Sequence, residues 1–151
     1  MRFLARFRRP ETEDDAFGSH SSDAPVVWNR ACDFEYQPRK EGDRALRAAL
    51  QLDSLTGNGG LGHAVDVMTE EEGRAAIAAF RHFGLEDTAL LVEQAFALPT
   101  ETMREALTDR YYDLTAGALE TSLERRLAEH REEFEPVSSL DRRRYSPEDV
   151  S

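Results

Sequence analysis

The chain has 151 residues, a single cysteine and a formal net charge of −11. This length suits one domain with its own core, and Cys32 has no partner for an internal disulfide, which fits a reducing compartment. No apolar run approaches the roughly 20 residues of a membrane span, and the N-terminus lacks the apolar core of a signal peptide, so we predict a cytoplasmic protein without membrane contact.

The negative charge is concentrated in the middle of the chain. Residues 41–135 hold nine basic and twenty acidic groups, whereas residues 1–40 and residues 136–151 are each neutral overall. Such a field repels nucleic acid, so this segment is not expected to bind DNA or RNA directly. The same field attracts basic proteins and favours solubility. A basic protein partner and a surface that serves only solubility are therefore both open.

The two ends of the chain predict little regular structure. Residues 1–24 contain few apolar side chains and predict a disordered tail. Residues 25–37 are ambiguous between strand and helix, but proline at the first helical position and the apolar side chains of Trp28, Ala31 and Cys32 on one side favour a helix. After Pro136 the chain becomes polar, so residues 137–151 predict a loose tail. The acidic helical domain is expected over residues 25–136.

A glycine-rich stretch separates two predicted helices. The first helix covers residues 42–55, and a shorter one covers residues 60–67. Glycine and asparagine tolerate positive φ, so Asn58, Gly59 and Gly60 predict a structural turn that ends the first helix.

The same stretch has a second interpretation as a phosphate-binding loop. Gly57, Gly59 and Gly62 match the spelling GxGxxG. That motif binds phosphate when a strand precedes the loop and a helix follows it. Here the segment that precedes Gly57 is typical of a helix, which does not fit the motif. A helical enzyme with a phosphate or nucleotide ligand at the Gly57–Gly62 loop is the alternative that this spelling leaves open.

Capping signals punctuate the rest of the chain. Thr69 and Glu72 predict a capping box for a helix that ends at Phe83, and Gly84 stops it. A helix over about 86–98 follows. A second capping box is predicted from Thr102 and Glu105.

The helix after this second box should bury Met103, Ala106, Leu107, Tyr111 and Leu114. The last predicted helix, about 115–134, carries an apolar stripe that includes His130. The predicted fold is an all-α, compact single-domain bundle of six to seven helices.

No group of side chains predicts catalysis. Asp53 lies on the apolar face of its helix, and we expect it to cap the following turn or to meet an arginine. His63 and Asp66 are three residues apart, but no further ligand follows at metal-site spacing. We therefore expect no catalytic residue, no metal and no cofactor, and a protein that is not an enzyme.

The acidic side chains predict a binding surface instead. Glu105, Asp109 and Asp113 lie four residues apart, so on one helix they would form a row spaced by about 6 Å. A second group occupies the first turn of the helix that begins after Thr69. The predicted partner-binding residues are Glu70, Glu71, Glu72, Glu105, Asp109 and Asp113.

Several segments resemble a known family. They are Asn58-Gly59-Gly60-Leu61, Phe83-Gly84-Leu85, Ala89–Phe96, Tyr111-Tyr112-Asp113, Leu119 with Leu123, Glu129-His130, and Glu132-Glu133-Phe134. Over about residues 40–135 the chain resembles the bacterial DNA-mimic protein family, whose C-terminal domain is otherwise of unknown function. It departs from the family pattern at Leu61, where an aromatic residue is usual, and at His63-Ala64, where Gln-Tyr is usual.

The resemblance implies an all-helical acidic fold. One characterised member of the family is a dimer whose acidic surface imitates DNA phosphates and occupies a transcription factor, whereas most members have no assigned activity. A homodimer and a DNA-binding protein as partner are therefore the expectations that the resemblance adds. The departures leave this fold expectation in place but do not carry over a particular partner. We therefore expect an acidic module that binds a basic protein in place of nucleic acid, with an inhibitor of a basic toxin as a variant of the same class.

Overall fold

The computed structural model describes residue 7 and residues 23–146, and the described residues form helices without any strand. The all-α prediction is confirmed, and the ambiguous segment after Pro25 is helical. The elements are α1 (Ala24–Ala31), α2 (Glu41–Val67), α3 (Glu70–His82), α4 (Glu86–Ala97), α5 (Glu101–Glu105), α6 (Thr108–Thr115), α7 (Ala118–Glu129), the 3-10 helix η2 (Arg131–Glu133) and α8 (Ser139–Tyr145). None of the described helices is both long and apolar enough to cross a membrane.

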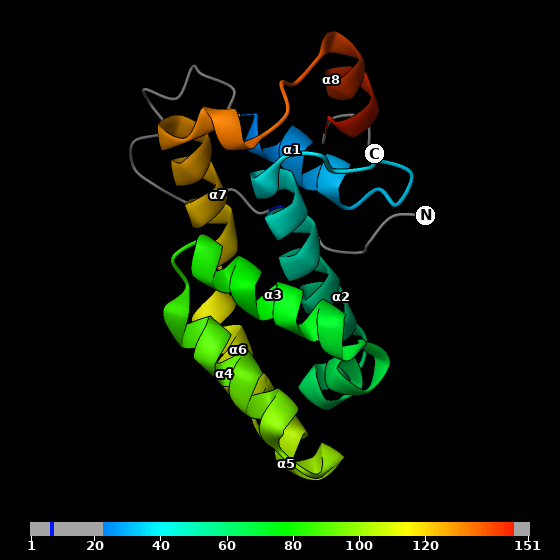
Figure 1. Ribbon diagram of the computed structural model, residues 1–151, viewed down its shortest axis with the longest axis vertical. Coiled ribbons are helices and arrows are strands. Elements are labelled where there is room, and N and C mark those ends of the chain that lie inside the picture. Colours follow the sequence, from blue (N-terminus) through cyan, green and yellow to red (C-terminus); the bar gives the residue numbers. More distant parts are fainter. Residues whose placement is uncertain (1–6, 8–22, 147–151) are drawn as a thin grey trace.

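The helices form an elongated bundle along the long α2 (Figure 1). Helix α3 packs against α2 on one side and α4 on the other, and α6 packs against both α2 and α4. Figure 1 places α1 and α8 at one end of the long axis and α5 at the other. The fully buried side chains at the centre include Leu46, Leu50, Phe80, Tyr111 and Leu123.

The local signals around α3 behave as predicted. The Thr69 hydroxyl accepts from the Glu72 amide, and the Glu72 carboxylate accepts from the Thr69 amide, so the capping box is present. Helix α3 ends at His82, and Gly84 follows with φ +78, a left-handed conformation that favours glycine. These features depend on contacts within four residues, which explains why the sequence indicates them.

A buried ion pair ties α1 to α2 and to the segment after η2. The Arg30 guanidinium, 1 % exposed, lies 2.9 Å from the Asp43 carboxylate and also donates to the carbonyl oxygens of Glu135 and Pro136. Asp43 accepts in addition from the Glu135 amide. Because each charge is compensated by a partner, burial of the pair is tolerated.

The predicted tails differ from their expectation where the structure describes them. Residues 139–145 form α8, capped by Ser138 and Asp141, and α8 packs against α1, so this part of the predicted loose tail is helical. Phe7 packs its ring edge against Trp28 with centroids 5.3 Å apart. The rest of the predicted tail at residues 1–22 lies outside the described residues.

The second predicted capping box is wrong. Thr100, not Thr102, is the N-cap of α5, and its hydroxyl accepts from the Met103 amide. Glu105 is the last residue of α5, and its carboxylate accepts a hydrogen bond from the Gly62 amide of α2 and not from the start of its own helix. Because α5 is only five residues long and separate from α6, Met103 is 45 % exposed and not buried.

The last predicted helix is interrupted as well. Helix α7 begins after Gly117, which has φ +71, and ends at Glu129. His130 leaves the helical conformation, and its side chain is 47 % exposed. Its predicted place in the apolar stripe of that helix is therefore wrong.

Candidate protein-binding surface

The glycine stretch is a break inside α2 and not a loop. Asn58 and Gly59 remain within the helix, and the backbone leaves the helical conformation at Gly60, with φ +90 and ψ 173. Beyond the break a short helical segment continues from Leu61 to Val67. The predicted structural turn is thus reduced to one residue, Gly60.

Two side chains from the junction of α5 and α6 satisfy the amides exposed by this break. The Leu61 amide donates to the Thr108 hydroxyl at 3.0 Å, and the Gly62 amide donates to the Glu105 carboxylate at 2.7 Å. A Cβ atom on Gly62 would lie 2.6 Å from that carboxylate, so the approach requires glycine. The amide that a phosphate would need is already bonded to Glu105, which removes the basis for a phosphate loop at Gly57–Gly62.

This contact also changes the predicted acidic row. Glu105 is turned toward α2, and α5 and α6 are separate helices, so the three acids do not line one helix. Asp109 and Asp113 are both exposed on α6, four residues apart. Neither carboxylate has an ion-pair or hydrogen-bond partner among the described residues.

The predicted group at the start of α3 is mostly engaged. Glu70 pairs with Arg74 at 2.7 Å. The Glu72 carboxylate caps the helix and accepts from Gln51 at 2.6 Å; its pKa is lowered, chiefly by the hydrogen bond from the Thr69 amide. Within the described part of the chain Glu71 is exposed without a partner.

Uncompensated charge is concentrated in α4, α5 and α6. Residues 86–115 hold seven acidic groups and two basic ones. One of the two, Arg104, pairs with Asp66 outside this segment. We define the α4–α6 acidic surface by the exposed carboxylates of this segment that lack a partner among the described residues: Asp87, Glu101, Asp109 and Asp113.

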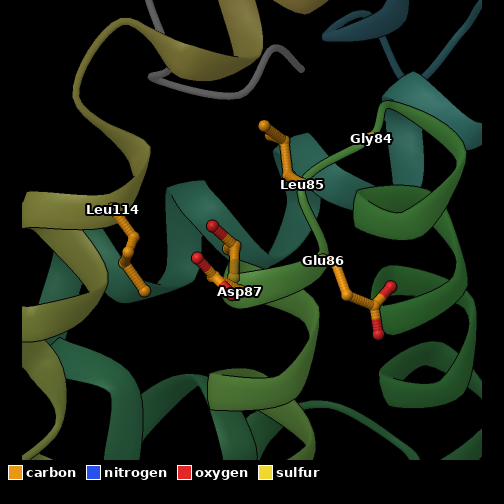
Figure 2. Close-up of a pocket in the computed structure, with 6 residues that line it drawn as sticks. Gly84, Leu85, Glu86, Asp87 and Leu114 are labelled. Carbon is orange, nitrogen blue, oxygen red and sulfur yellow. The ribbon is translucent and has the colours of Figure 1, made fainter.

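A hollow of about 230 Å³ adjoins this surface where the turn between α3 and α4 meets α6. Figure 2 shows the Asp87 side chain directed toward Leu114 of α6, whereas Glu86 points away from it. Glu86 instead accepts from Arg81 at 3.2 Å. The hollow therefore places the unpaired Asp87 carboxylate beside the apolar side chain of Leu114. Among the described residues, no group of three or more potential metal ligands is found.

Several acids at the other end of the molecule are paired with arginines, although Glu129 is exposed there without a partner among the described residues. Around α1, α7 and α8, arginines pair with Asp23, Asp33 and Glu35. Glu133 of η2 accepts from Arg126, and its pKa is lowered chiefly by this hydrogen bond. Because Figure 1 places α5 far from α1 and α8, the net negative charge is presented toward one end of the long axis.

Sequence reasoning missed the polar pair that holds α6 in place. The hydroxyl of the fully buried Tyr111 donates to the Asp53 carboxylate at 2.9 Å, so Asp53 neither caps a turn nor meets an arginine. The Tyr112 hydroxyl donates to the Thr56 carbonyl oxygen at 3.0 Å. The adjacent tyrosines are the signal that could have indicated a polar contact, since a buried tyrosine hydroxyl usually finds a partner.

Comparison with known proteins places the chain in a family. No curated protein and no solved structure matches it. The model of the DMP19-like protein family matches residues 40–149, which include α2 to α8 and the whole α4–α6 acidic surface. The chain therefore belongs to the DMP19-like protein family, in agreement with the resemblance of its sequence to DNA-mimic proteins.

Proposed function

We propose that this protein binds a basic, DNA-binding protein through the α4–α6 acidic surface and thereby takes the place of DNA. The observation that carries the proposal is the pair Asp109 and Asp113, two exposed carboxylates on one face of α6 with no partner among the described residues. Their spacing of about 6 Å repeats negative charge along a rod, as a phosphate backbone does. Membership in the DMP19-like family supports the same function.

The proposal uses the acids of α4, α5 and α6 that have no partner among the described residues. Glu105 and Glu72 are bonded to backbone amides and Glu70 to an arginine, so the proposal rests on Asp87, Glu101, Asp109 and Asp113. A surface of several single charges acts through its summed field, and binding should be fast and sensitive to salt.

The test compares two charge reversals of equal size. The test variant reverses two charges of the proposed surface, with Asp109→Lys and Asp113→Lys. The control variant reverses two exposed acids near the opposite end of the molecule, with Glu129→Lys and Glu132→Lys. Both variants alter the net charge equally, so a difference between them reports position and not total charge. We expect the first pair to weaken binding at least about 10-fold and the second by less than about 3-fold.

The measurement starts with affinity capture from the lysate of the native cell at about 0.05 M and about 0.5 M NaCl. A captured basic protein is then mixed with labelled duplex DNA, and fluorescence anisotropy reports whether the parent protein releases the DNA. Release by the parent but not by Asp109→Lys/Asp113→Lys is the expected result. A partner retained equally by both variants at both salt concentrations would reject the mimic and indicate an apolar interface, and recovery of no partner would favour acidity that serves only solubility.

A further inference from the structure

Helix α8 is a basic segment seated on acidic groups that flank α1. Arg142 lies 2.7 Å from Asp23, the residue that precedes α1. Arg144 lies 3.1 Å from Asp33 and 3.0 Å from Glu35, which follow α1. We define Asp23, Asp33 and Glu35 as the α1 acidic surface. An arginine-bearing helix therefore already occupies an acidic surface of this protein, in the same chain.

The remaining contacts of α8 are also mainly polar. The Tyr145 hydroxyl donates to the Asp33 carboxylate at 2.6 Å, and the Asn29 amide donates to the Tyr145 carbonyl oxygen at 2.8 Å. Arg30 approaches Asp141 at 3.3 Å. Tyr145 is the one buried residue of α8, and Leu140 is 62 % exposed. Little apolar area holds the helix in place.

These contacts make the docking weak and dependent on salt. A helix of seven residues is marginal by itself, so α8 owes its conformation to its contacts. The Arg142 and Arg144 side chains are about half exposed, whereas Asp23 and Asp33 are largely buried, so these ion pairs are open to water on the arginine side and are partly screened by salt. Undocking would leave three carboxylates at α1 without the arginines of α8, although Asp23 would keep Arg131 at 2.9 Å.

We infer that the α1 acidic surface is a second binding site, specific for an arginine-bearing helical segment of a protein partner, and that α8 occupies it in cis as an autoinhibitory segment. The contacts of α8 define the ligand: two arginines separated by one residue, followed by a tyrosine that reaches Asp33. The site lies at the end of the molecule opposite α5 and shares no residue with the α4–α6 acidic surface (Figure 1).

The experiment displaces α8 within the full chain and supplies its sequence in trans. The probe is a fluorescent peptide of residues 137–146, and the release variant carries Arg142→Ala and Arg144→Ala. Arg143→Ala is the matched control, because Arg143 is exposed on α8 and has no partner in the described part of the chain. We expect the release variant to bind the peptide at least about 10-fold more tightly than the parent and the control, because its own helix no longer competes.

Three results would overturn the inference. Equal binding of the peptide by parent and release variant would show that α8 does not cover the site. Binding that survives Asp33→Asn and Glu35→Gln in the release variant would place the peptide elsewhere. A dimeric parent with a monomeric release variant, measured by sedimentation, would mean that α8 is exchanged between two copies and is not displaced by another protein.

Amide hydrogen exchange of the parent gives a second measurement that needs no substitution. Raising NaCl from about 0.05 M to about 0.5 M should speed exchange in α8 at least about 3-fold without speeding it in α3, because screening weakens the contacts of α8. Exchange in α8 that is unchanged or slower at high salt would contradict docking by ion pairs. Neither test involves Asp109 or Asp113, so its outcome is independent of the proposed function.

Discussion

At the scale of single residues, Asp53 shows how a partly buried acid is satisfied without a cation. Its carboxylate accepts from the Tyr111 hydroxyl, and burial raises its pKa above the ordinary value of an aspartate, although the hydrogen bond acts in the opposite direction. Because the pKa is higher in the folded state than in the unfolded state, ionisation of Asp53 destabilises the fold. This cost is absent at a pH below the unfolded pKa and develops as the pH rises through the folded pKa.

Asp53→Asn should therefore raise the melting temperature at pH 7. Asparagine keeps an oxygen acceptor for Tyr111 and removes the partly buried charge. The advantage over the parent should shrink as the pH falls toward 4, which calorimetry at a series of pH values measures. Tyr111→Phe, which leaves Asp53 without its donor, should instead cost about 1–3 kcal/mol. A lower melting temperature for Asp53→Asn at pH 7 would show that the charge itself stabilises the fold.

At the scale of elements, the break in α2 is held by the junction of α5 and α6. Gly60 has φ +90 and ψ 173, a conformation open almost only to glycine. Because Gly60 has no side chain, the Glu105 carboxylate can approach its backbone closely. The break therefore ends the first helical segment of α2 and also provides the contact for the end of α5. The position of α6, and of the carboxylates on it, depends on this contact.

Two substitutions of glycine by alanine in the same helix should have opposite effects. Gly60→Ala should lower the free energy of unfolding by about 1–3 kcal/mol, because a Cβ atom strains that conformation. Gly57→Ala should raise it by up to about 1 kcal/mol, since Gly57 is helical and a Cβ atom there meets nothing within 4 Å. Urea unfolding measures both. Equal shifts in the two variants would mean that Gly60 is not the residue on which the break depends.

At the scale of the whole molecule, compensation of charge differs between the two ends. Ion pairs with arginines neutralise the acids next to α1, whereas the exposed acids of α4, α5 and α6 repel one another. A net charge of −11 on a small domain opposes the compact state through this repulsion. Salt should therefore stabilise the whole fold although it weakens the docking of α8.

Raising NaCl from about 0.02 M to about 0.3 M should lift the melting temperature by about 2–4 °C, which corresponds to about 1 kcal/mol for a chain of this size. The Asp109→Lys/Asp113→Lys variant is less negative and should show a smaller rise. Circular dichroism at 222 nm measures both. A melting temperature that falls with salt in the parent would indicate that ion pairs, and not repulsion, dominate the global stability.

Part of the candidate surface could be predicted from the sequence. The exposure of Asp109 and Asp113 follows from their helical spacing opposite Tyr111. Glu105 has the same spacing, but its carboxylate accepts a hydrogen bond from the Gly62 amide. The Glu72 carboxylate accepts from the Thr69 amide and so caps its own helix. Helical spacing places a carboxylate on a face but does not show which backbone amide will reach it from another helix.

The sequence by itself determined the all-α class, the two ends of α3 and the distribution of charge along the chain. Thr69 with Glu72, and Gly84 after α3, act through contacts with near neighbours, and net charge is a sum over residues that no fold can alter. Only the tertiary structure decided which charges remain available. Glu105 meets an amide 43 residues away, Asp53 a hydroxyl 58 residues away, and Asp33 a tyrosine 112 residues away. Such partners are brought together by the packing of several helices at once, and no local pattern in the chain encodes their distance.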